Sequence, residues 1–516
     1  MQNKQFILFN RSRHQSLFIP HHPLLQVGKI SLLIFYFLCS ALVTQAQIKA
    51  IKPFGKIRAL VVGISDYQHE KITDLKYAHR DAEAFATFLQ IESAWKAAPE
   101  DVVLLTNEAA TYAKFINELE AISQKCAPKD RLYIYFSGHG DVEQVSVEKM
   151  GYLLFHDVSP TTYASGGACM VNTLDQHLTD LVLNKGVEVI LISDACRSGA
   201  LAGSKFGGPE ATAAAVSSLF SNTVRILSCQ PNQVSVEGPN WGGGRGLFSY
   251  YLIDGLKGMA DEDQNRYVNK FELERYVQDQ VRAANRSQLP FANGADNKRL
   301  SKVDPNLLES SGSDEMDQLA ESDQSIKPGV PDTNWQAYLD DFKSAIANNH
   351  LMFPEEGSAY AIYQSLGNSA SAQPFKALMK VDLASALQNT AQQALNDYIT
   401  SPEEEVGRRW LNDSVYINYP DYLGTAAKLL GESSYFYSDV KSREYYFRGV
   451  NLRLTSHSSS NRDSVLELAL KQQEQALILQ PIAPHIHNEM GLIYSDLNQI
   501  QKELLAFQKA NALSPQ

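Results

Sequence analysis

Apolar residues follow two patterns over the first 300 positions of this 516-residue chain. Short continuous runs of aliphatic residues predict buried strands, and apolar residues at every third or fourth position predict amphipathic helices. The predicted strands are 57–64, 102–105, 132–136, 187–192 and 224–228, and the predicted helices are 73–91, 112–125, 173–184 and 246–256. Strands that alternate with helices form a mainly parallel sheet flanked by helices on both faces. The sequence therefore predicts an α/β fold for residues 56–303.

The pattern changes after residue 303. Residues 304–332 are rich in Ser, Asp and Glu and have no apolar period, which predicts a flexible acidic linker. Residues 333–516 have apolar positions at helical spacing throughout and predict an all-α domain. Its last part resembles a tetratricopeptide repeat in the offsets of Gly491, Tyr494, Phe507, Ala510 and Pro515. We expect this domain to bind a protein partner or substrate or to regulate the first domain, and the sequence leaves these alternatives open.

The first 46 residues predict a secretory signal peptide. Basic residues precede an apolar run at 30–43, and small residues precede a cleavage point after Ala46. The run is short for a bilayer span, and the alternative is an uncleaved membrane anchor. We therefore expect an exported protein that is periplasmic, attached to the cell surface or secreted.

Charge and cysteine content narrow the function. The net charge of −12 at pH 7 argues against nucleic acid as a partner. Three cysteines, Cys126, Cys169 and Cys229, have no metal-ligand spacing and are predicted to be buried thiols. Cys196 differs from these three cysteines because it lies in the segment DACRSG, directly after a predicted strand.

Two predicted strands end in residues that carry chemistry. The strand at 132–136 leads to His139 between two glycines, and the strand at 187–192 leads to Asp194 and Cys196, which lies 57 positions after the histidine. Carboxyl ends of parallel strands meet at one edge of a sheet, where ligands bind. An imidazole beside a thiol takes its proton and makes it a nucleophile. We therefore expect Cys196 to be the nucleophile and His139 the general base and acid, although a lone histidine is more often structural.

The segments YFSGHG and DACRSG, at this spacing, resemble the caspase-like superfamily of cysteine peptidases, on its metacaspase and bacterial side. The resemblance covers about residues 56–303 and implies an endopeptidase acting on protein or peptide substrates. It also implies an oxyanion hole formed by the backbone N–H groups of Gly140 and Cys196. Zymogens of this superfamily often process themselves, and Lys205, in a Gly-, Ala- and Ser-rich stretch, is the predicted cleavage site.

The same resemblance bears on specificity. Asp194 stands where animal caspases have glutamine, and Asp81 lies where metacaspases have a second pocket acid. Two carboxylates in one pocket select a cation, so we predict cleavage after Arg or Lys. The alternative for Asp81 is a surface acid paired with Lys76 or His79. The alternatives for the whole protein are an inactive caspase-fold scaffold for protein interactions and a legumain-like peptidase that cleaves after Asn.

Residues 260–273 partly match a calcium-binding loop. The matching ligand positions are Asp261, Asp263, Asn265, Asn269 and Glu272. The glycine of such loops is replaced by Arg266, and Asn269 with Glu272 also forms the pattern of a helix capping box. The sequence favours the helix start over the metal site. We expect no cofactor to be required for the chemistry and keep calcium as a candidate activator.

Overall fold

The computed structural model describes residues 54–91, 94–142, 151–160, 162–195, 224–229, 233–304, 333–366, 372–400 and 416–513. The predicted signal peptide, nearly all of the predicted linker, Cys196 and Lys205 lie outside these residues.

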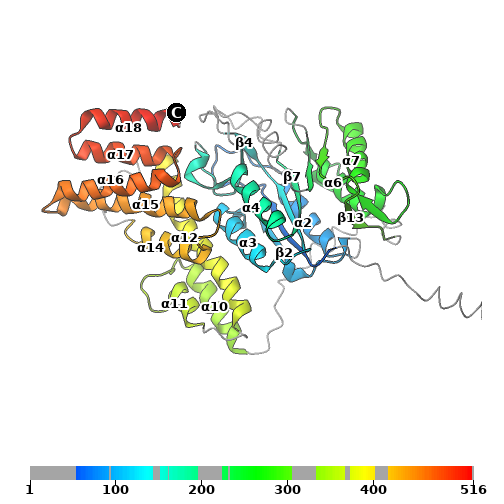
Figure 1. Ribbon diagram of the computed structural model, residues 1–516, viewed down its shortest axis with the longest axis horizontal. Helices are drawn as coiled ribbons and strands as arrows, with labels where there is room; N and C mark the ends of the chain where they lie inside the picture. Colours follow the sequence, from blue (N-terminus) through cyan, green and yellow to red (C-terminus); the bar gives the residue numbers. More distant parts are fainter. Residues whose placement is uncertain are drawn as a thin grey trace, which may run out of the picture. The chain divides into compact units, whose positions relative to one another are not determined.

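A six-stranded sheet lies at the centre of residues 54–304 (Figure 1). Its order is β12-β8-β7-β3-β1-β2, and all neighbours are parallel except β12, which is antiparallel to β8. The strands are β1 (Ile57–Gly63), β2 (Val102–Thr106), β3 (Arg131–Ser137), β7 (Glu188–Asp194), β8 (Val224–Leu227) and β12 (Phe291–Asn293). The predicted mainly parallel sheet is confirmed. The antiparallel edge strand was not predicted, because three residues are too few to show a period.

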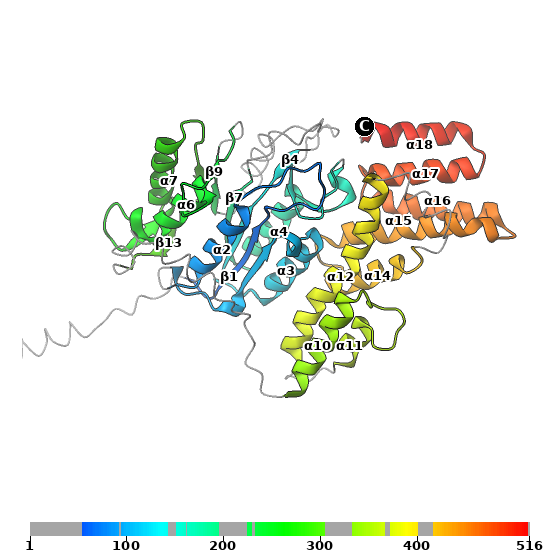
Figure 2. The ribbon, with the colours of Figure 1, turned by 180° about the vertical axis from the view of Figure 1, so that it is seen from behind.

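Helices cover both faces of this sheet (Figures 1 and 2). They are α2 (Ala78–Leu89), α3 (Tyr112–Lys125), α4 (Val171–Leu183), α6 (Leu247–Asp254) and α7 (Lys270–Ala284). Alternate residues of β1 and β3 belong to two separate hydrophobic clusters, because side chains along a strand point to opposite faces. One cluster contains residues of α3 and α4, and the other contains residues of α2, α6 and α7. Both faces are therefore buried, as the continuous apolar runs predicted.

Short strands add three small antiparallel sheets. The first contains β4 (Gly140–Val142), β5 (Gly151–Leu154) and β6 (Ala168–Met170), the second β9 (Glu237–Gly238) and β10 (Arg245–Gly246), and the third β11 (Tyr267–Asn269) and β13 (Arg299–Lys302). Single helical turns occur at η2 (Pro99–Asp101), η3 (Asn107–Ala109), η4 (Tyr163–Ser165) and η5 (Gly255–Met259). None of these elements was predicted, and two of the small sheets, β4-β5-β6 and β9-β10, contribute residues to the candidate site.

The described residues from 333 onward form helices and contain no strand. They are α10 (Thr333–Ala347), α11 (Ala359–Ser365), α12 (Gln373–Thr400), α14 (Tyr419–Leu430), α15 (Tyr437–Thr455), η6 (Ser456–Ser458), α16 (Arg462–Leu479), α17 (Pro484–Asp496) and α18 (Ile500–Leu513). Gly491 lets α17 approach α18 closely, since a methyl group there would lie 2.5 Å from the ring of Phe507. This contact suits a helical repeat, and the assignment to tetratricopeptide repeats stays a prediction. None of the helices described here is long and apolar enough to cross a membrane.

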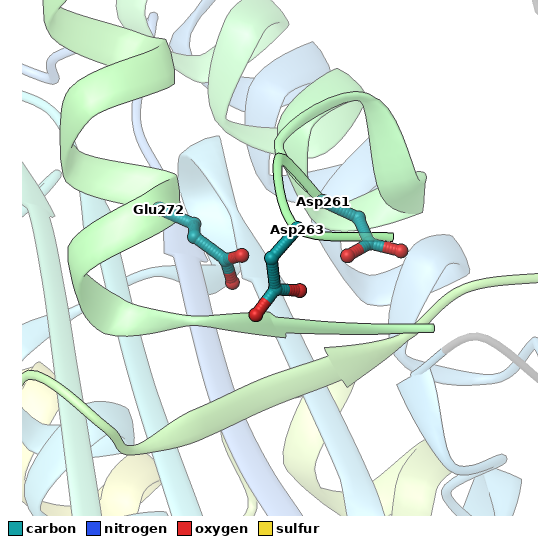
Figure 3. Close-up of side chains that lie close together, drawn as sticks. All are labelled: Asp261, Asp263 and Glu272. Atoms are coloured by element: carbon teal, nitrogen blue, oxygen red, sulfur yellow. The ribbon is translucent and has the colours of Figure 1, made fainter. Parts of the chain in front are cut away.

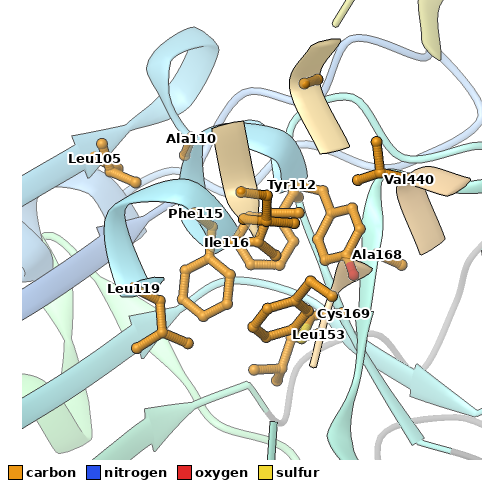
Figure 4. Close-up of a cluster of buried hydrophobic side chains, with 14 of the residues drawn as sticks. Leu105, Ala110, Tyr112, Phe115, Ile116, Leu119, Leu153, Ala168, Cys169 and Val440 are labelled. Carbon is orange, nitrogen blue, oxygen red and sulfur yellow. The ribbon is translucent and has the colours of Figure 1, made fainter. Parts of the chain in front are cut away.

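The helical region packs directly against the sheet region. Val440 of α15 belongs to the same hydrophobic cluster as Tyr112 and Phe115 of α3 (Figure 4). The interface is also polar: the Asn396 amide donates to the carbonyl of Asp157 at 2.7 Å, and Ser165 and His485 form a buried hydrogen bond of 2.9 Å. The sequence predicted a linker between the two regions and gave no sign of this interface.

Candidate active site

The site lies at the edge of the sheet where β3 and β7 end. These strands pair in parallel with Arg131 opposite Glu188 and Ser137 opposite Asp194, a constant offset of 57 positions. The same offset separates His139 from Cys196. The N–H of Gly138 also donates to the carbonyl of Asp194 at 3.2 Å, so the segment that follows β3 still lies beside the end of β7.

His139 is buried and fixed from two sides. Its Nε2 lies 2.6 Å from the carbonyl oxygen of Thr73, and its backbone N–H donates to the hydroxyl of Tyr67 at 2.7 Å. The Tyr67 ring packs on the imidazole with centroids 4.9 Å apart. Because a carbonyl only accepts, Nε2 carries the hydrogen and the neutral ring has its lone pair on Nδ1. Nδ1 is therefore the nitrogen suited to take a proton from a thiol.

Glycines on both sides of His139 suit this crowded position. A methyl group at Gly138 would lie 3.0 Å from the Tyr67 hydroxyl oxygen. Gly140 begins β4 and pairs with Leu153 of β5, and next to it the carboxylate of Asp141 accepts a hydrogen bond of 2.6 Å from the Tyr163 hydroxyl. The role of Gly140 in an oxyanion hole stays a prediction.

The two predicted pocket acids lie together beside this edge. Asp81 of α2 is 2% exposed and Asp194 at the end of β7 is 7% exposed. A methyl group at Gly246 would lie 2.8 Å from Oδ2 of Asp81 and 3.0 Å from Oδ2 of Asp194. The two carboxylate oxygens thus face one point, and only a residue without a side chain leaves that point open.

Asp81 is held by the chain that enters α6. Its Oδ1 accepts from Nε of Arg245 at 2.7 Å, and both of its oxygens lie 3.0 Å from the N–H of Gly246. The alternative of a surface acid paired with Lys76 or His79 is wrong, because Asp81 shares the buried face of α2 with Ala82.

Burial is the largest influence on the pKa of Asp81. It raises the pKa of Asp81 to about 6, an effect that Arg245 opposes and the neighbouring Asp194 increases. Asp194 accepts a hydrogen bond of 3.1 Å from Ser249, whose hydroxyl lies 2.6 Å from that of Tyr135. Both carboxyl groups are therefore tied to fixed polar partners, in surroundings that exclude most water.

A small cavity opens between these residues. Its volume is about 10 Å³, and it is lined by Asp81, Asp194, Gly246, Ser235 and Glu237, among others. The Glu237 carboxylate accepts from the backbone N–H groups of Lys76 and Tyr77, both at 2.9 Å. Such a volume holds at most one water molecule, so a substrate side chain requires the pocket to widen.

Four residues of this pocket were missed by the sequence analysis: Arg245, Gly246, Ser249 and Glu237. Arg245 and Gly246 end a glycine-rich loop, which was the one available signal that the backbone there approaches another group closely. Nothing in the sequence pattern indicated that a buried arginine would face Asp81.

The acidic loop before α7 forms a second cluster of carboxylates (Figure 3). One oxygen from each of Asp261, Asp263 and Glu272 lies within 4.8 Å of the others. The favoured interpretation, a capping box of Asn269 and Glu272, is confirmed. Both uses of Glu272 are compatible, since a carboxylate has two oxygens.

Asn265 and Arg266 complete this loop. The Asn265 amide donates to Asp263 at 2.7 Å, and its oxygen accepts from the N–H of Tyr267 at 2.9 Å. Arg266 has a φ of 67°, the left-handed conformation that glycine adopts at this position of calcium loops. The chain therefore makes this turn with arginine in place of the glycine.

The prediction that Cys126, Cys169 and Cys229 are buried free thiols is confirmed. Burial raises the pKa of the Cys126 thiol to about 11 and that of Cys169 well above its usual value. Neither thiol is a nucleophile at neutral pH.

Comparison with known proteins gives one informative match. Residues 56–300 match the sequence model of a family described as the caspase domain. A protein of Geobacter sulfurreducens has 19% identity over 49% of this chain and 96% of its own, with a TM-score of 0.33. Pro-Sf-caspase-1 has 11% identity over 48% of this chain and 91% of its own, also with a TM-score of 0.33. Both scores are too low to support an argument, and the comparison with curated proteins found no match.

Proposed function

Because residues 56–300 of this chain belong to the caspase-domain family, we propose that the protein is a cysteine endopeptidase that cleaves after Arg or Lys. The observation that carries the specificity is the pair of buried carboxylates, Asp81 and Asp194, whose oxygens face one point at Gly246. The observation that supports the chemistry is the fixed tautomer of His139 at the same edge of the sheet.

In the proposed reaction, Nδ1 of His139 takes the proton of the Cys196 thiol. The thiolate attacks the carbonyl carbon of the substrate, and the resulting oxyanion is stabilised by the N–H groups of Gly140 and Cys196. The imidazolium then gives its proton to the leaving amine, and a thioester remains. Water attacks the thioester with the imidazole again as base, which releases the acid and restores the thiol.

Charge supports a cationic substrate side chain. Three carboxylates, those of Asp81, Asp194 and Glu237, line the pocket. Among the residues that the structure describes, a single guanidinium, that of Arg245, contacts Asp81. The pocket is therefore negative overall, and an aspartate side chain would be repelled there.

Active-site labelling tests this proposal. An acyloxymethyl ketone peptide ending in Arg should label Cys196 in a mass spectrum of the digested protein, and the same peptide ending in Asp should not. Labelling should be lost in His139→Ala and Cys196→Ala, while Cys126, Cys169 and Cys229 serve as internal controls because they are buried. Absence of labelling by any peptide would favour an inactive scaffold, and labelling only by an Asn peptide would favour a legumain-like enzyme.

Self-cleavage after Lys205 follows from the same specificity. We propose that the active form is cut there, in the stretch that follows Cys196. The intact mass of the wild-type protein should show two fragments, and that of Cys196→Ala should show one chain. A wild-type enzyme that is active and uncut at Lys205 would contradict this step.

For calcium we propose a structural role at the loop of Asp261, Asp263 and Glu272, whose oxygens converge. Bound there, calcium would supply positive charge to hold the loop, and it would take no part in bond cleavage. We further propose that the protein is exported and that the helical region binds a protein partner or substrate or regulates the enzyme.

A further inference from the structure

Arg245 is a buried cation beside a pocket that is proposed to receive another cation. It is 8% exposed and belongs to β10, where it pairs with Gly238 of β9. Its Nε contacts Oδ1 of Asp81, while Oδ2 of the same carboxylate faces Gly246 together with Oδ2 of Asp194. The guanidinium and the open point of the pocket therefore use different oxygens of Asp81.

We propose that Arg245 is a positioning residue for specificity: it turns one oxygen of Asp81 toward the substrate and stabilises the negative charge of that carboxylate. This inference rests on the proposed peptidase function. Arg245 then acts beside the substrate and not in its place. With no substrate bound, Asp81 has one cationic partner, Arg245; with substrate bound, the pocket acids also contact the Arg or Lys side chain of the substrate.

Electrostatics explain why such a residue is needed. In the described part of the chain, the titratable groups around Asp81 are Arg245 from β10, Asp194 from β7, Tyr135 from β3 and Glu237 from β9. Only Arg245 among them is positive. Buried carboxylates that lie close together disfavour each other's ionisation, so without a counter-ion one of them takes a proton. A pocket with a protonated acid has less charge to attract Arg or Lys.

Geometry also argues against the opposite role, in which Arg245 blocks the pocket. Its contact is with Oδ1, and the next residue, Gly246, donates its N–H to the same carboxylate at 3.0 Å. These two donors fix the plane of the carboxylate. The point shared by Asp81 and Asp194 lies at Gly246, a residue without a side chain of its own.

The pH dependence of cleavage tests the proposal. A carboxyl group is charged above its pKa, so cleavage after Arg should fall in the wild-type enzyme as the pH decreases through about 6. In Arg245→Gln this fall should move up by about one pH unit or more, because an opposite charge at this range lowers a carboxyl pKa by roughly 1–3 units. At about pH 6 kcat/KM for an Arg peptide should then be at least about fivefold lower than in wild type, through KM, and near pH 9 it should return to the wild-type value. In Arg245→Lys, which keeps the positive charge, cleavage should fall at the same pH as in the wild-type enzyme.

The matched control is Arg80→Gln. Arg80 adjoins Asp81 in α2, and its guanidinium donates to the carbonyl of Gly243 at 2.9 Å, in the loop that leads to Arg245. The Arg80→Gln substitution removes the same charge from the same region without changing a contact of the two acids. It should therefore leave the pH dependence of kcat/KM unchanged. The rate of Cys196 alkylation by iodoacetamide, which does not use the pocket, should be the same in all these variants.

Two results would overturn the proposal. One is an Arg245→Gln profile that superimposes on the wild type, and the other is a higher kcat/KM at every pH, which would make Arg245 a plug. If Arg245→Gln does not fold, Arg245→Lys is the deciding variant. Lysine keeps the positive charge, so a shift of one pH unit in the pH at which its kcat/KM falls would contradict the role of charge. A wild-type enzyme that cleaves no peptide would contradict the proposed function itself, and this inference with it.

Discussion

Two clusters of carboxylates on this chain use the same chemical groups under opposite conditions. Asp81 and Asp194 are both buried. Asp81 accepts hydrogen bonds from Arg245 and Gly246, and Asp194 accepts one from Ser249. In the other cluster, Asp263 is exposed, Asp261 is half-buried and only Glu272 is buried. The first pair is shielded from water and depends on protein donors for its hydrogen bonds, whereas the second cluster is open to water on one side.

This difference in exposure to water determines what each cluster can bind. A rigid, poorly hydrated pair of acids discriminates strongly between a cation and an anion, because a wrong charge there cannot be solvated. A hydrated loop of oxygen ligands suits a hard divalent ion, which keeps some of its own water. Each prediction below removes one condition from one of the clusters.

The largest effect should come from Asp194→Asn, which keeps the shape of the side chain and removes its charge. Truncating one partner of a buried charge pair costs about 2–5 kcal/mol, so kcat/KM for an Arg peptide should fall at least about 30-fold. The control is Asp279→Asn, an exposed residue of α7. A loss of less than about threefold would show that the pocket acids do not select the substrate.

Gly246→Ala should have the next largest effect. The added methyl group would lie within 3.0 Å of an oxygen of each acid and would fill the point that they share. Overpacking of this kind costs about 1–3 kcal/mol, so KM for an Arg peptide should rise about tenfold. Gly424→Ala in α14 is the control, since it adds the same methyl group outside the pocket, 3.3 Å from the carboxylate of Glu444. An unchanged KM in Gly246→Ala would place the substrate side chain elsewhere.

Calcium should act on the second cluster alone. At about 100 times its dissociation constant, calcium should stabilise the protein by about 2.7 kcal/mol, seen as a higher melting temperature. Asp263→Asn should abolish this shift, because it removes an exposed carboxylate of the loop. No shift in the wild type, or an equal shift in the variant, would contradict a calcium site here.

The smallest effect should come from Arg266→Gly. The left-handed backbone costs a residue with a side chain about 1 kcal/mol, part of which glycine loses again through the entropy of the unfolded chain. The free energy of unfolding in urea should therefore rise by about 0.5 kcal/mol. Gln264→Gly, with a φ of 58° in the same loop, should have a similar effect. Destabilisation in both variants would show that the two side chains contribute contacts that outweigh the strain.

Much of the central sheet could be read from the sequence, because strands buried on both faces leave continuous apolar runs such as Val187–Ile192. His139 and Asp194 could be placed at its edge because they directly follow such runs. The short strands β9 and β10 could not, since two residues carry no period and their place depends on distant partners. Arg245 was missed for the same reason: its partner, Asp81, is 164 positions away, and no local pattern records that contact.

The interface with the helical region shows the same limit. Tyr112 and Asp439 are partners across 327 positions, and both are buried. In the sequence each has the pattern of an ordinary helical residue. A hydrogen bond between residues far apart in the sequence depends on how the whole chain folds. Such pairs can therefore be identified only in the structure.

The most direct test of the central claim is to compare kcat/KM for three peptides that differ only in the residue before the cleaved bond, which is Arg, Lys or Asp. The account predicts that the purified protein hydrolyses the peptides ending in Arg and Lys at least about 100-fold better than the one ending in Asp, and that Cys196→Ala hydrolyses none. Preference for the Asp peptide would contradict the acidic pocket. Equal hydrolysis by Cys196→Ala would contradict the nucleophile.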